Sequence, residues 1–407
     1  MSQAQADPDG SALLTSPEAG SLLAAAVEHA GGVLVSWTLD HVDANPPHST
    51  TATYSAVVDW PYGRREELLG VSARASGPAA TDAAAEIFAD GEREVAVWLY
   101  PQDPDLPGLP RAAYAESMAE VCNSHHVFSR PVSPATIGLQ MVGYRPRRRA
   151  VVKVTADTGE AVYVKVLRAR LFPDVVHRHQ LLAEAGVPVA PIAATTDDHL
   201  LILRELPGTP LARAVFDPED PCTAEDLIGL LDSLPSSVAR LERRPPWSDA
   251  VQHYATVVAR AMPSLEQRLA SLVDVIQQGL AALPPGHEAT HGDFHEGQVH
   301  VAGGRICGLL DIDTLGPGHR VDDLACLVAH LSTIQRMNSA QQARVHHLIR
   351  TWVPVFDTRV DPTQLRLRSA AVIISLATGP FRGQEPDWER ETSLMIGSAE
   401  ALVRQVT

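Results

Sequence analysis

The chain has 407 residues, of which 45% are hydrophobic and 20% charged, as is typical of a globular protein of two or three domains. Its formal net charge of −16 argues against nucleic acid as a partner, because phosphate backbones are bound by basic surfaces. No apolar run approaches the roughly 20 residues needed to cross a bilayer, and residues 1–20 carry acids instead of the basic start of a secretion signal.

The four cysteines are scattered, without the spacing of a metal site or of a disulfide framework. We therefore expect reduced thiols and a cytoplasmic protein that does not bind membranes. The acidic balance would attract a cationic substrate. The sequence leaves open whether the protein is a monomer or a homodimer.

The first 130 residues predict a small α+β domain. A helix is expected at 21–30, strands rich in β-branched and aromatic residues at 33–40, 50–60, 66–75 and 94–100, and a helix at 111–122. A proline-rich stretch at 101–110 separates the last strand from the second helix. This N-terminal domain, at 1–130, contains no recognisable catalytic residues.

From residue 131 the pattern changes. Strands are predicted at 137–143, 150–157, 160–167, 189–194 and 199–205, with a helix at 173–185 that ends at Gly186. Beyond residue 208 the chain is predicted to be mostly helical, apart from a compact stretch at 288–316. We thus expect a sheet domain at 131–208 and a helical domain at 209–407.

The strongest functional signal is the sequence HGDFHEGQVH at 291–300, followed by a turn, a short apolar strand and an aspartate. Phosphoryl transfer from a magnesium nucleotide needs a carboxylate beside the attacking hydroxyl, a polar metal ligand and a second carboxylate on the metal. Asp293, Gln298 and Asp311 occur in this order, and all three offer hard oxygen ligands. Either half of the pattern alone is common, because an aspartate can cap a helix or end an ordinary strand.

These residues resemble the catalytic segment of the aminoglycoside phosphotransferase superfamily, whose members are relatives of protein kinases. The resemblance implies an α+β, two-lobed, protein-kinase-like fold with a five-stranded antiparallel N-lobe and a helical C-lobe, here preceded by an α+β cap domain. It implies ATP and Mg²⁺ as cofactors, Asp293 as catalytic base, and Gln298 and Asp311 as metal ligands. Gln298 stands where asparagine is usual, a feature shared with the maltokinase-like branch. His291 and His295 are expected to pin the loop through hydrogen bonds.

ATP contacts are predicted upstream. Lys165 lies in the apolar strand AVYVKV, where a buried ammonium needs an anion such as the ATP phosphates, and Lys153 is a competing candidate. The next helix lacks the acid that pairs with this lysine in kinases, so the partner of Lys165 stays unassigned. The segment LILRELPG at 201–208 resembles an inter-lobe hinge, in which the backbone of Glu205 and Leu206 would bind adenine.

The loop GYRPRRR at 143–149 stands where a glycine-rich phosphate loop would be, but it lacks the glycines. Its arginines would contact phosphates directly, or form a solvated basic turn.

Three features favour a particular acceptor: the N-terminal domain, which resembles the cap of maltokinases, the Gln-x-His spacing of Gln298 and His300, and the extended sequence DIDTLGPGHRVDDL at 311–324. Together they resemble actinobacterial glucosamine kinases most closely. Asp313 would then bind the protonated amine and His300 a sugar hydroxyl. Asp313 as a turn cap, and His300 as a structural histidine, are the alternatives.

Trp388, in the polar stretch between the last helices, is a candidate sugar platform or a plain anchoring residue. Asp322 and Asp323 are expected to cap the following helix and brace the catalytic loop.

The sequence thus predicts direct in-line transfer from ATP to a hydroxyl of a small sugar, with glucosamine to glucosamine 6-phosphate as the expected reaction. Asp293 would orient the acceptor hydroxyl as well as take its proton. The alternatives are a maltokinase-like or aminoglycoside phosphotransferase, or a catalytically silent kinase-like binding protein.

Overall fold

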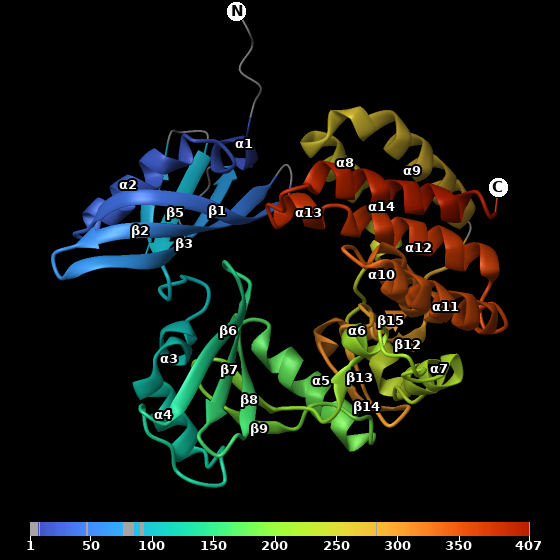
Figure 1. The fold of residues 1–407 in the computed structure, drawn as a ribbon, viewed down its shortest axis with the longest axis horizontal. Helices are drawn as coiled ribbons and strands as arrows, with labels where there is room; N and C mark the ends of the chain where they lie inside the picture. Colours follow the sequence, from blue (N-terminus) through green and yellow to red (C-terminus); the bar gives the residue numbers. More distant parts are fainter. Residues whose placement is uncertain are drawn as a thin grey trace, which may run out of the picture. The chain divides into compact units, whose positions relative to one another are not determined.

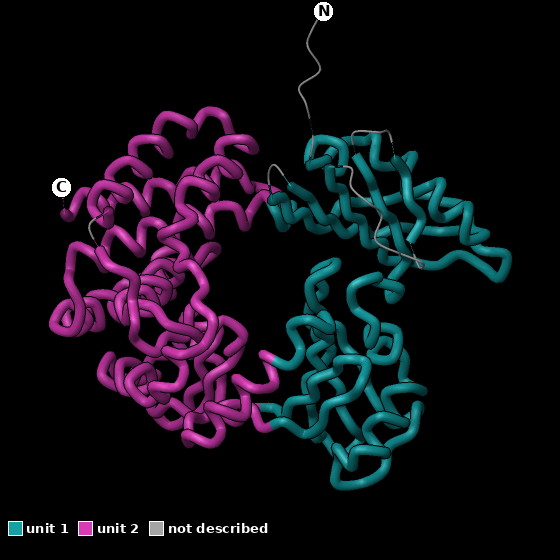
Figure 2. Tube along the Cα trace, turned by 180° about the vertical axis from the view of Figure 1, so that it is seen from behind, with its two compact units in different colours: residues 1–173, 192–205, 382–385 teal, residues 174–191, 206–381, 386–407 magenta. Residues whose placement is uncertain are grey.

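The computed structural model describes residues 7, 9–45, 48–75, 85–89, 93–281 and 283–406. The chain forms two compact units, coloured separately in Figure 2. Unit 1 comprises Met1–Pro173, Ile192–Glu205 and Arg382–Glu385, and unit 2 comprises Asp174–Pro191, Leu206–Phe381 and Pro386–Thr407. Within the described residues, no helix combines the length and apolar character that a membrane crossing requires.

Unit 1 begins with an antiparallel five-stranded sheet in the order β1-β2-β3-β5-β4 (Figure 1). Helix α2 packs on this sheet, and their buried side chains, among them Leu23, Tyr54 and Leu69, form one apolar core. The elements are α1 (Ser11–Leu14), α2 (Ala19–His29), β1 (Val33–Asn45), β2 (Ser49–Trp60), β3 (Gly63–Ala75), β4 (Glu86–Ala89) and β5 (Arg93–Leu99).

A second antiparallel sheet in unit 1 has the order β6-β7-β8-β10-β9. Strand β7 alternates strictly, with Ala150, Val152, Val154 and Ala156 buried, as expected when one face of a sheet is covered. The elements are α3 (Leu109–Ala113), α4 (Ala115–Ser124), β6 (Ile137–Arg145), β7 (Arg149–Ala156), β8 (Ala161–Leu167), β9 (Ile192–Thr195) and β10 (Leu200–Arg204).

Helices α3 and α4 share the apolar core of this second sheet, although they precede residue 130 in the chain. The predicted domain boundary at 130 therefore falls inside one compact unit, and it stays a prediction.

Unit 2 is mainly helical and has two apolar cores. One includes α6, α7 and α11, the other α8, α9, α12 and α14, and α10 contributes buried residues to both. The helices are α5 (Phe172–Glu184), α6 (Leu211–Ala214), α7 (Ala224–Asp232), α8 (Val251–Ala261), α9 (Glu266–Leu280), α10 (Arg320–Thr333), α11 (Ser339–Phe356), α12 (Pro362–Leu376), α13 (Gly379–Arg382) and α14 (Trp388–Val403).

Two small sheets lie within this unit. Strands β11 (Thr209–Pro210), β13 (Val299–Ala302) and β14 (Arg305–Leu309) form one of them, and β12 (Glu288–Thr290) pairs with β15 (Gly316–Gly318) in the other. The turn between β13 and β14 uses Gly303 and Gly304 with positive φ, as a tight hairpin requires.

The predicted α+β architecture, with antiparallel sheets followed by a helical region, is confirmed. The strands of both sheets and helix α5 lie within a few residues of their predicted positions, and Gly186 has the left-handed conformation expected after a helix. Strand β4 was not predicted, because its four residues are too few to show an alternating pattern.

A hydrogen-bonded chain joins the two sheets of unit 1. Trp98 on β5 donates its indole N–H to the hydroxyl of Tyr144 on β6 over 2.8 Å, and this hydroxyl donates to Asp103 over 2.8 Å. The same carboxylate accepts the backbone N–H of Arg147 at 2.7 Å. Because these groups are largely removed from water, each bond that is lost leaves a costly unsatisfied partner.

We expect Tyr144→Phe to lower the free energy of unfolding by about 1–3 kcal/mol, because both Trp98 and Asp103 lose a partner. Urea titration followed by tryptophan fluorescence measures this, with Tyr114→Phe as a control, since Tyr114 is 52% exposed. Equal stability of the two variants would contradict the role assigned to this chain of hydrogen bonds.

Candidate active site

The loop at 291–298, here called the HGD loop, connects β12 to β13 in unit 2. Phe294 anchors it, because its ring is fully buried in the core and meets the His291 ring edge-on at 6.0 Å between centroids. Asp293 and His295, on either side of Phe294, remain half-buried. The loop thus has a fixed centre and presents polar side chains beside it.

Gly292 is required by the backbone. Its φ is +83°, and a Cβ at this position would lie 2.7 Å from the carbonyl oxygen of Thr314. The Thr314 hydroxyl also donates to the backbone oxygen of His291 over 2.9 Å. The glycine therefore lets the HGD loop lie directly against the turn at 312–314, which follows Asp311.

His291 pins the loop, as predicted. Its Nδ1 accepts the backbone N–H of Asp293 at 3.3 Å, so the proton of the neutral ring resides on Nε2, which donates to the carbonyl oxygen of Leu310 over 2.9 Å. The Leu310 N–H donates in turn to the carbonyl oxygen of Gln298 over 2.7 Å. Both backbone groups of Leu310 are thus bound to the loop, and Asp311 follows directly.

Asp311 has φ 48° and ψ 50°, the left-handed conformation that few residues other than glycine adopt. Aspartate tolerates this conformation better than most residues, and such backbone outliers occur preferentially at functional sites. Hydrogen bonds through Leu310 therefore bring Asp311 to the same loop as Asp293 and Gln298. The structure brings these three predicted residues together.

Asp323, on the first turn of α10, binds the other side of the loop. Its carboxylate accepts the backbone N–H groups of His291 at 2.9 Å and of Gly292 at 2.8 Å. Asp322 accepts the N–H of His319 in a capping box. The expectation that these two aspartates cap the helix and brace the loop is confirmed.

Two further side chains on the same face of α10 contact the loop, one and two turns after Asp323. Cys326 donates its thiol hydrogen to Asp293 with a sulfur–oxygen distance of 3.8 Å. His330 stacks on His295 with ring centroids 4.0 Å apart and 6° between the planes. Residues three and seven apart share a helix face, so one face of α10 supports three successive parts of the loop.

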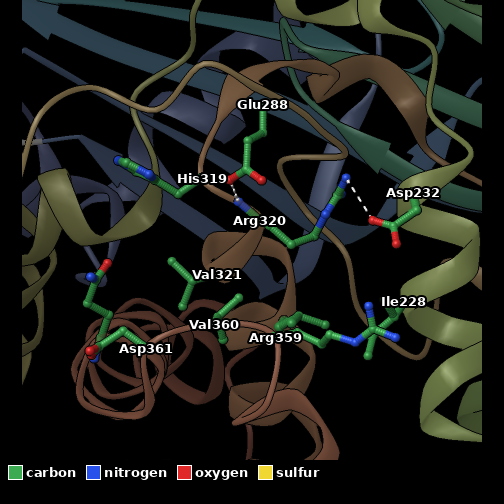
Figure 3. Close-up of a pocket in the computed structure, with 11 residues that line it drawn as sticks. Ile228, Asp232, Glu288, His319, Arg320, Val321, Arg359, Val360 and Asp361 are labelled. Carbon is green, nitrogen blue, oxygen red and sulfur yellow. Dashed lines mark hydrogen bonds and ion pairs between the residues drawn. The ribbon is translucent and has the colours of Figure 1, made fainter.

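The start of α10 is itself anchored, as Figure 3 shows. The backbone N–H of Arg320 donates to Glu288 over 2.7 Å, and its guanidinium lies 3.6 Å from Asp232. The same guanidinium lies 3.7 Å from Asp323. These residues, except Asp323, line a cavity of about 330 Å³ beside the helix.

Burial is the largest influence on the pKa values of His295 and Glu296 in the loop. Burial and the neighbouring His330 lower the pKa of His295 to about 4, so this imidazole is neutral at neutral pH. Burial alone would raise the pKa of Glu296, but His330, whose ring nitrogen lies 3.7 Å from the carboxylate, and the nearby His295 hold it below its usual value. Glu296 is therefore an anion within 4 Å of both rings.

Two groups of side chains could be considered for a metal: Asp293 with Cys326 and His330, and His295 with Glu296 and His330. In the first, burial raises the pKa of the Cys326 thiol well above its ordinary value, so the thiol stays protonated. In the second, the two imidazole rings are stacked with 6° between their planes.

The predicted ATP contacts lie mostly in unit 1. Lys165 is buried on β8, paired with Val151 and Leu201, on the face opposite the apolar core. Lys153 lies on that face too, but its ammonium is 2.7 Å from Glu205. This ion pair makes Lys153 the weaker candidate for a phosphate contact.

Glu205 already uses its backbone N–H, which donates to the carbonyl oxygen of Ala161 over 3.3 Å. For adenine, Glu205 would therefore offer only its carbonyl oxygen as an acceptor, and the donor would be the backbone N–H of Leu206. Leu206 is buried and begins the next segment of unit 2.

The arginines of the loop at 143–149 are bound to the N-terminal part of unit 1. Arg147 donates to the hydroxyl of Ser72 over 2.7 Å, and Arg148 lies 2.6 Å from Asp43. Of the two alternatives for this loop, the structure favours neither, because these arginines have protein partners.

The predicted acceptor residues are placed differently from one another. His300 is buried, and its Nδ1 donates to the carbonyl oxygen of Pro207 over 3.1 Å, as the structural alternative requires. Trp388 begins α14 and packs edge-on against Phe381 at 5.0 Å, an anchoring contact.

Asp313 is half-buried in a turn of 3-10 helix at Ile312–Thr314. It attracts the guanidinium of Arg178, whose pKa is lowered mainly by burial. The Nε of Arg178 donates to the carbonyl oxygen of Leu315 over 3.3 Å.

Sequence reasoning missed Cys326, His330 and Glu296 as neighbours of the predicted catalytic residues. The signal was the spacing of Asp323, Cys326 and His330 in the otherwise apolar stretch VDDLACLVAHL, where polar side chains recur at i, i+3 and i+7.

The pKa of Asp323 yields a pH prediction. Burial raises it to about 6 in the folded protein, above the ordinary value of 3.8 expected for the unfolded chain. The folded state therefore binds this proton more tightly than the unfolded chain does. As the pH rises from about 4 to above 6, the free energy of unfolding falls by about 3 kcal/mol through this group. In Asp323→Asn this loss should be absent.

Urea unfolding of the wild type and of Asp323→Asn at several pH values between 4 and 7 measures the difference. Asp274→Asn, on the exposed face of α9, is the control and should follow the wild type. A difference in unfolding free energy that does not change with pH would show that Asp323 titrates normally.

Comparison with known proteins adds a family assignment to this geometry. The sequence profile of the phosphotransferase enzyme family, APH, matches residues 145–355, just over half of the chain. A comparison with curated proteins gives no match at the threshold applied.

Several solved structures have a similar fold. A variant aminoglycoside phosphotransferase in ternary complex with AMP-PNP and hygromycin B is 15% identical, with a TM-score of 0.48, covering 66% of this chain and 94% of that one. An ethanolamine kinase from Plasmodium vivax is 11% identical, with a TM-score of 0.45, covering 71% and 90%. A macrolide 2'-phosphotransferase from Brachybacterium faecium is 17% identical, with a TM-score of 0.41, covering 69% and 98%.

Proposed function

Because the chain belongs to the phosphotransferase enzyme family, and is thus an ATP-dependent small-molecule kinase, we propose that it phosphorylates an amino sugar, with glucosamine converted to glucosamine 6-phosphate. The observation that supports phosphoryl transfer is the connection of both backbone groups of Leu310, next to Asp311, to the loop that carries Asp293 and Gln298. We further propose a cytoplasmic enzyme, in keeping with its four free cysteines.

Asp293 is the proposed catalytic base. Its carboxylate is half-buried, and the Cys326 thiol binds one of its oxygens, which limits the orientations that the side chain adopts. In direct in-line transfer this carboxylate orients the acceptor hydroxyl and takes its proton as the new phosphate ester bond forms. The leaving group is ADP, and no covalent enzyme intermediate is needed.

Gln298 and Asp311 are the proposed ligands of Mg²⁺. Their amide and carboxylate oxygens are the hard donors that this ion prefers, and the left-handed backbone at Asp311 holds its side chain at the end of β14. When bound, the metal would offset the negative charge of the nucleotide phosphates. The residues present therefore fit the ion.

Lys165 is proposed to contact the ATP phosphates, and the backbone of Glu205 and Leu206 the adenine edge. The burial of Lys165 supports this role, because a buried ammonium is stable only beside negative or polar partners. Burial also supports the choice of Lys165 over Lys153, because Lys165 is buried whereas the side chain of Lys153 is 28% exposed.

The amine of the substrate is proposed to bind Asp313. The attraction between Asp313 and Arg178 is a competing contact, so a bound ammonium would have to share this carboxylate with the guanidinium. His300 through its second ring nitrogen, and Trp388, are weaker candidates for sugar contacts, because both have structural partners.

A neutral-sugar or aminoglycoside acceptor is the second candidate. The attraction between Asp313 and Arg178 favours it, because a carboxylate that already interacts with a protein cation has less need of a substrate amine.

Replacement of the base tests the mechanism. We expect Asp293→Asn to lower kcat by about 10²–10⁴, because general-base catalysis is lost while the amide retains the shape of the carboxylate. Coupled ADP release measures kcat, and Asp274→Asn is the matched control on the surface. Wild-type kcat in Asp293→Asn would remove Asp293 from the mechanism.

An acceptor panel tests the substrate. We expect turnover with glucosamine, and little with glucose, N-acetylglucosamine, maltose or kanamycin. In Asp313→Asn, kcat/KM for glucosamine should fall about 10–100-fold, the effect of losing a hydrogen bond to a charged group. Turnover of maltose or kanamycin instead, or unchanged glucosamine kinetics in Asp313→Asn, would favour the second candidate.

A further inference from the structure

We propose that His295 is a positioning residue that donates its Nε2 proton to the side-chain oxygen of Gln298 and thereby orients this amide toward the metal. The inference rests on the proposed role of Gln298 as a metal ligand. It concerns the residues of the loop itself, which the structure describes in full.

The first observation is the tautomer of His295. Its Nδ1 accepts the backbone N–H of Gly297 at 3.1 Å, so this nitrogen carries no proton. A neutral imidazole ring carries one N–H group, so the hydrogen of His295 must be on Nε2. His291 shows the same pattern two residues before Asp293, with Nδ1 accepting from the N–H two residues on and Nε2 donating to a carbonyl oxygen.

The second observation is the position of Gln298. As placed, the amide nitrogen Nε2 of its side chain lies 2.9 Å from Nε2 of His295, and a half-turn of the amide group exchanges this nitrogen with the oxygen. Because Nε2 donates, the amide atom that faces it must be the oxygen, which fixes the orientation of the amide. An amide oxygen has two lone pairs, so it can accept this hydrogen and still bind a metal ion through the other.

The third observation is that the ring of His295 is held from two sides. A Cβ on residue 297 would lie 2.8 Å from Cε1 and 3.0 Å from Nδ1 of the ring, so glycine at this position allows the backbone to approach it. On one face the ring of His330 stacks at 4.0 Å. The N–H of Gln298 donates to the carbonyl oxygen of His295 over 2.9 Å, which closes the turn that brings the two side chains together.

His295 therefore contacts the side chain of Gln298, the proposed metal ligand, and is not itself proposed as a ligand. Residues that hold a metal ligand in place typically change metal affinity 10–100-fold when they are replaced. His295 would therefore govern metal binding without contacting the metal, the nucleotide or the acceptor.

Two isosteric variants separate this role from a general structural one. The amide nitrogen of glutamine falls near Nε2 of histidine, so His295→Gln keeps a donor for Gln298. The side chain of asparagine ends near Nδ1, so His295→Asn keeps the bond to Gly297 but cannot reach Gln298. His295→Ala removes both bonds.

The measurement is direct Mn²⁺ binding by electron paramagnetic resonance, in the presence of AMP-PNP and without turnover. We expect the dissociation constant for Mn²⁺ to rise about tenfold or more in His295→Asn and His295→Ala, and to stay within about threefold of the wild type in His295→Gln. Thermal unfolding of each variant reports whether the fold is retained.

Unchanged Mn²⁺ affinity in His295→Ala would overturn the inference, and so would an equal loss in all three variants, which would indicate a purely structural role. Gln298→Ala is the reference, and His295→Ala in this background should add no further loss. If Gln298→Ala itself bound Mn²⁺ normally, the inference would fail, whereas ATP-dependent turnover in the acceptor panel would still uphold the proposed phosphotransferase function.

Discussion

The hydrogen bonds from two successive backbone N–H groups to the buried carboxylate of Asp323 are the constraint on which the candidate active site depends. A short polar loop has no regular hydrogen-bonding pattern of its own, so its buried N–H groups need partners from elsewhere. Helix α10 supplies them, because it lies between the two apolar cores of unit 2 and contributes buried residues to both. The position of the loop is therefore set by the packing of the helical core.

The same logic explains why the residues beside Asp323 on α10 matter. Cys326 contacts Asp293 and His330 contacts His295, both from the helix face that carries Asp323. A rotation of the helix would therefore displace these two contacts together with the hydrogen bonds of Asp323. On the other side of the loop, His291 and Gln298 hold Leu310, which places Asp311. The proposed base and both proposed metal ligands are thus connected to one helix and one strand by backbone and side-chain hydrogen bonds.

Much of the fold could be predicted from the sequence, because the strands alternate clearly and the turns contain glycine and proline. The order Asp293, Gln298 and Asp311 could be predicted too, since it lies in one continuous stretch with a short hairpin inside it. The supporting residues on α10 were harder to predict. Their polar character is visible in the sequence, but which loop they face depends on how α10 packs, and the periodicity of one helix does not contain that information.

The substrate residues were the hardest to predict, for a related reason. Asp313 lies two positions from Asp311, so on a strand the two side chains would share one face, but the local backbone is a 3-10 turn and this relation does not hold. Its attraction to Arg178 arises from α5, a helix more than a hundred residues earlier in the chain. His300 likewise binds Pro207, across a distance of 93 residues.

Contacts between residues so far apart in the sequence explain why local sequence predicts the proposed catalytic residues but not the residues that would select the acceptor. The carboxylate, the amide and the second carboxylate lie within 20 residues, and their backbone connections are mostly made among themselves. The groups proposed to bind the acceptor instead contact separate elements, so a change in α5 or in the segment after β10 would alter them without touching Asp293. The proposed residues for acceptor selection and for transfer are thus held by different parts of the fold, an arrangement that lets one catalytic loop serve many acceptors.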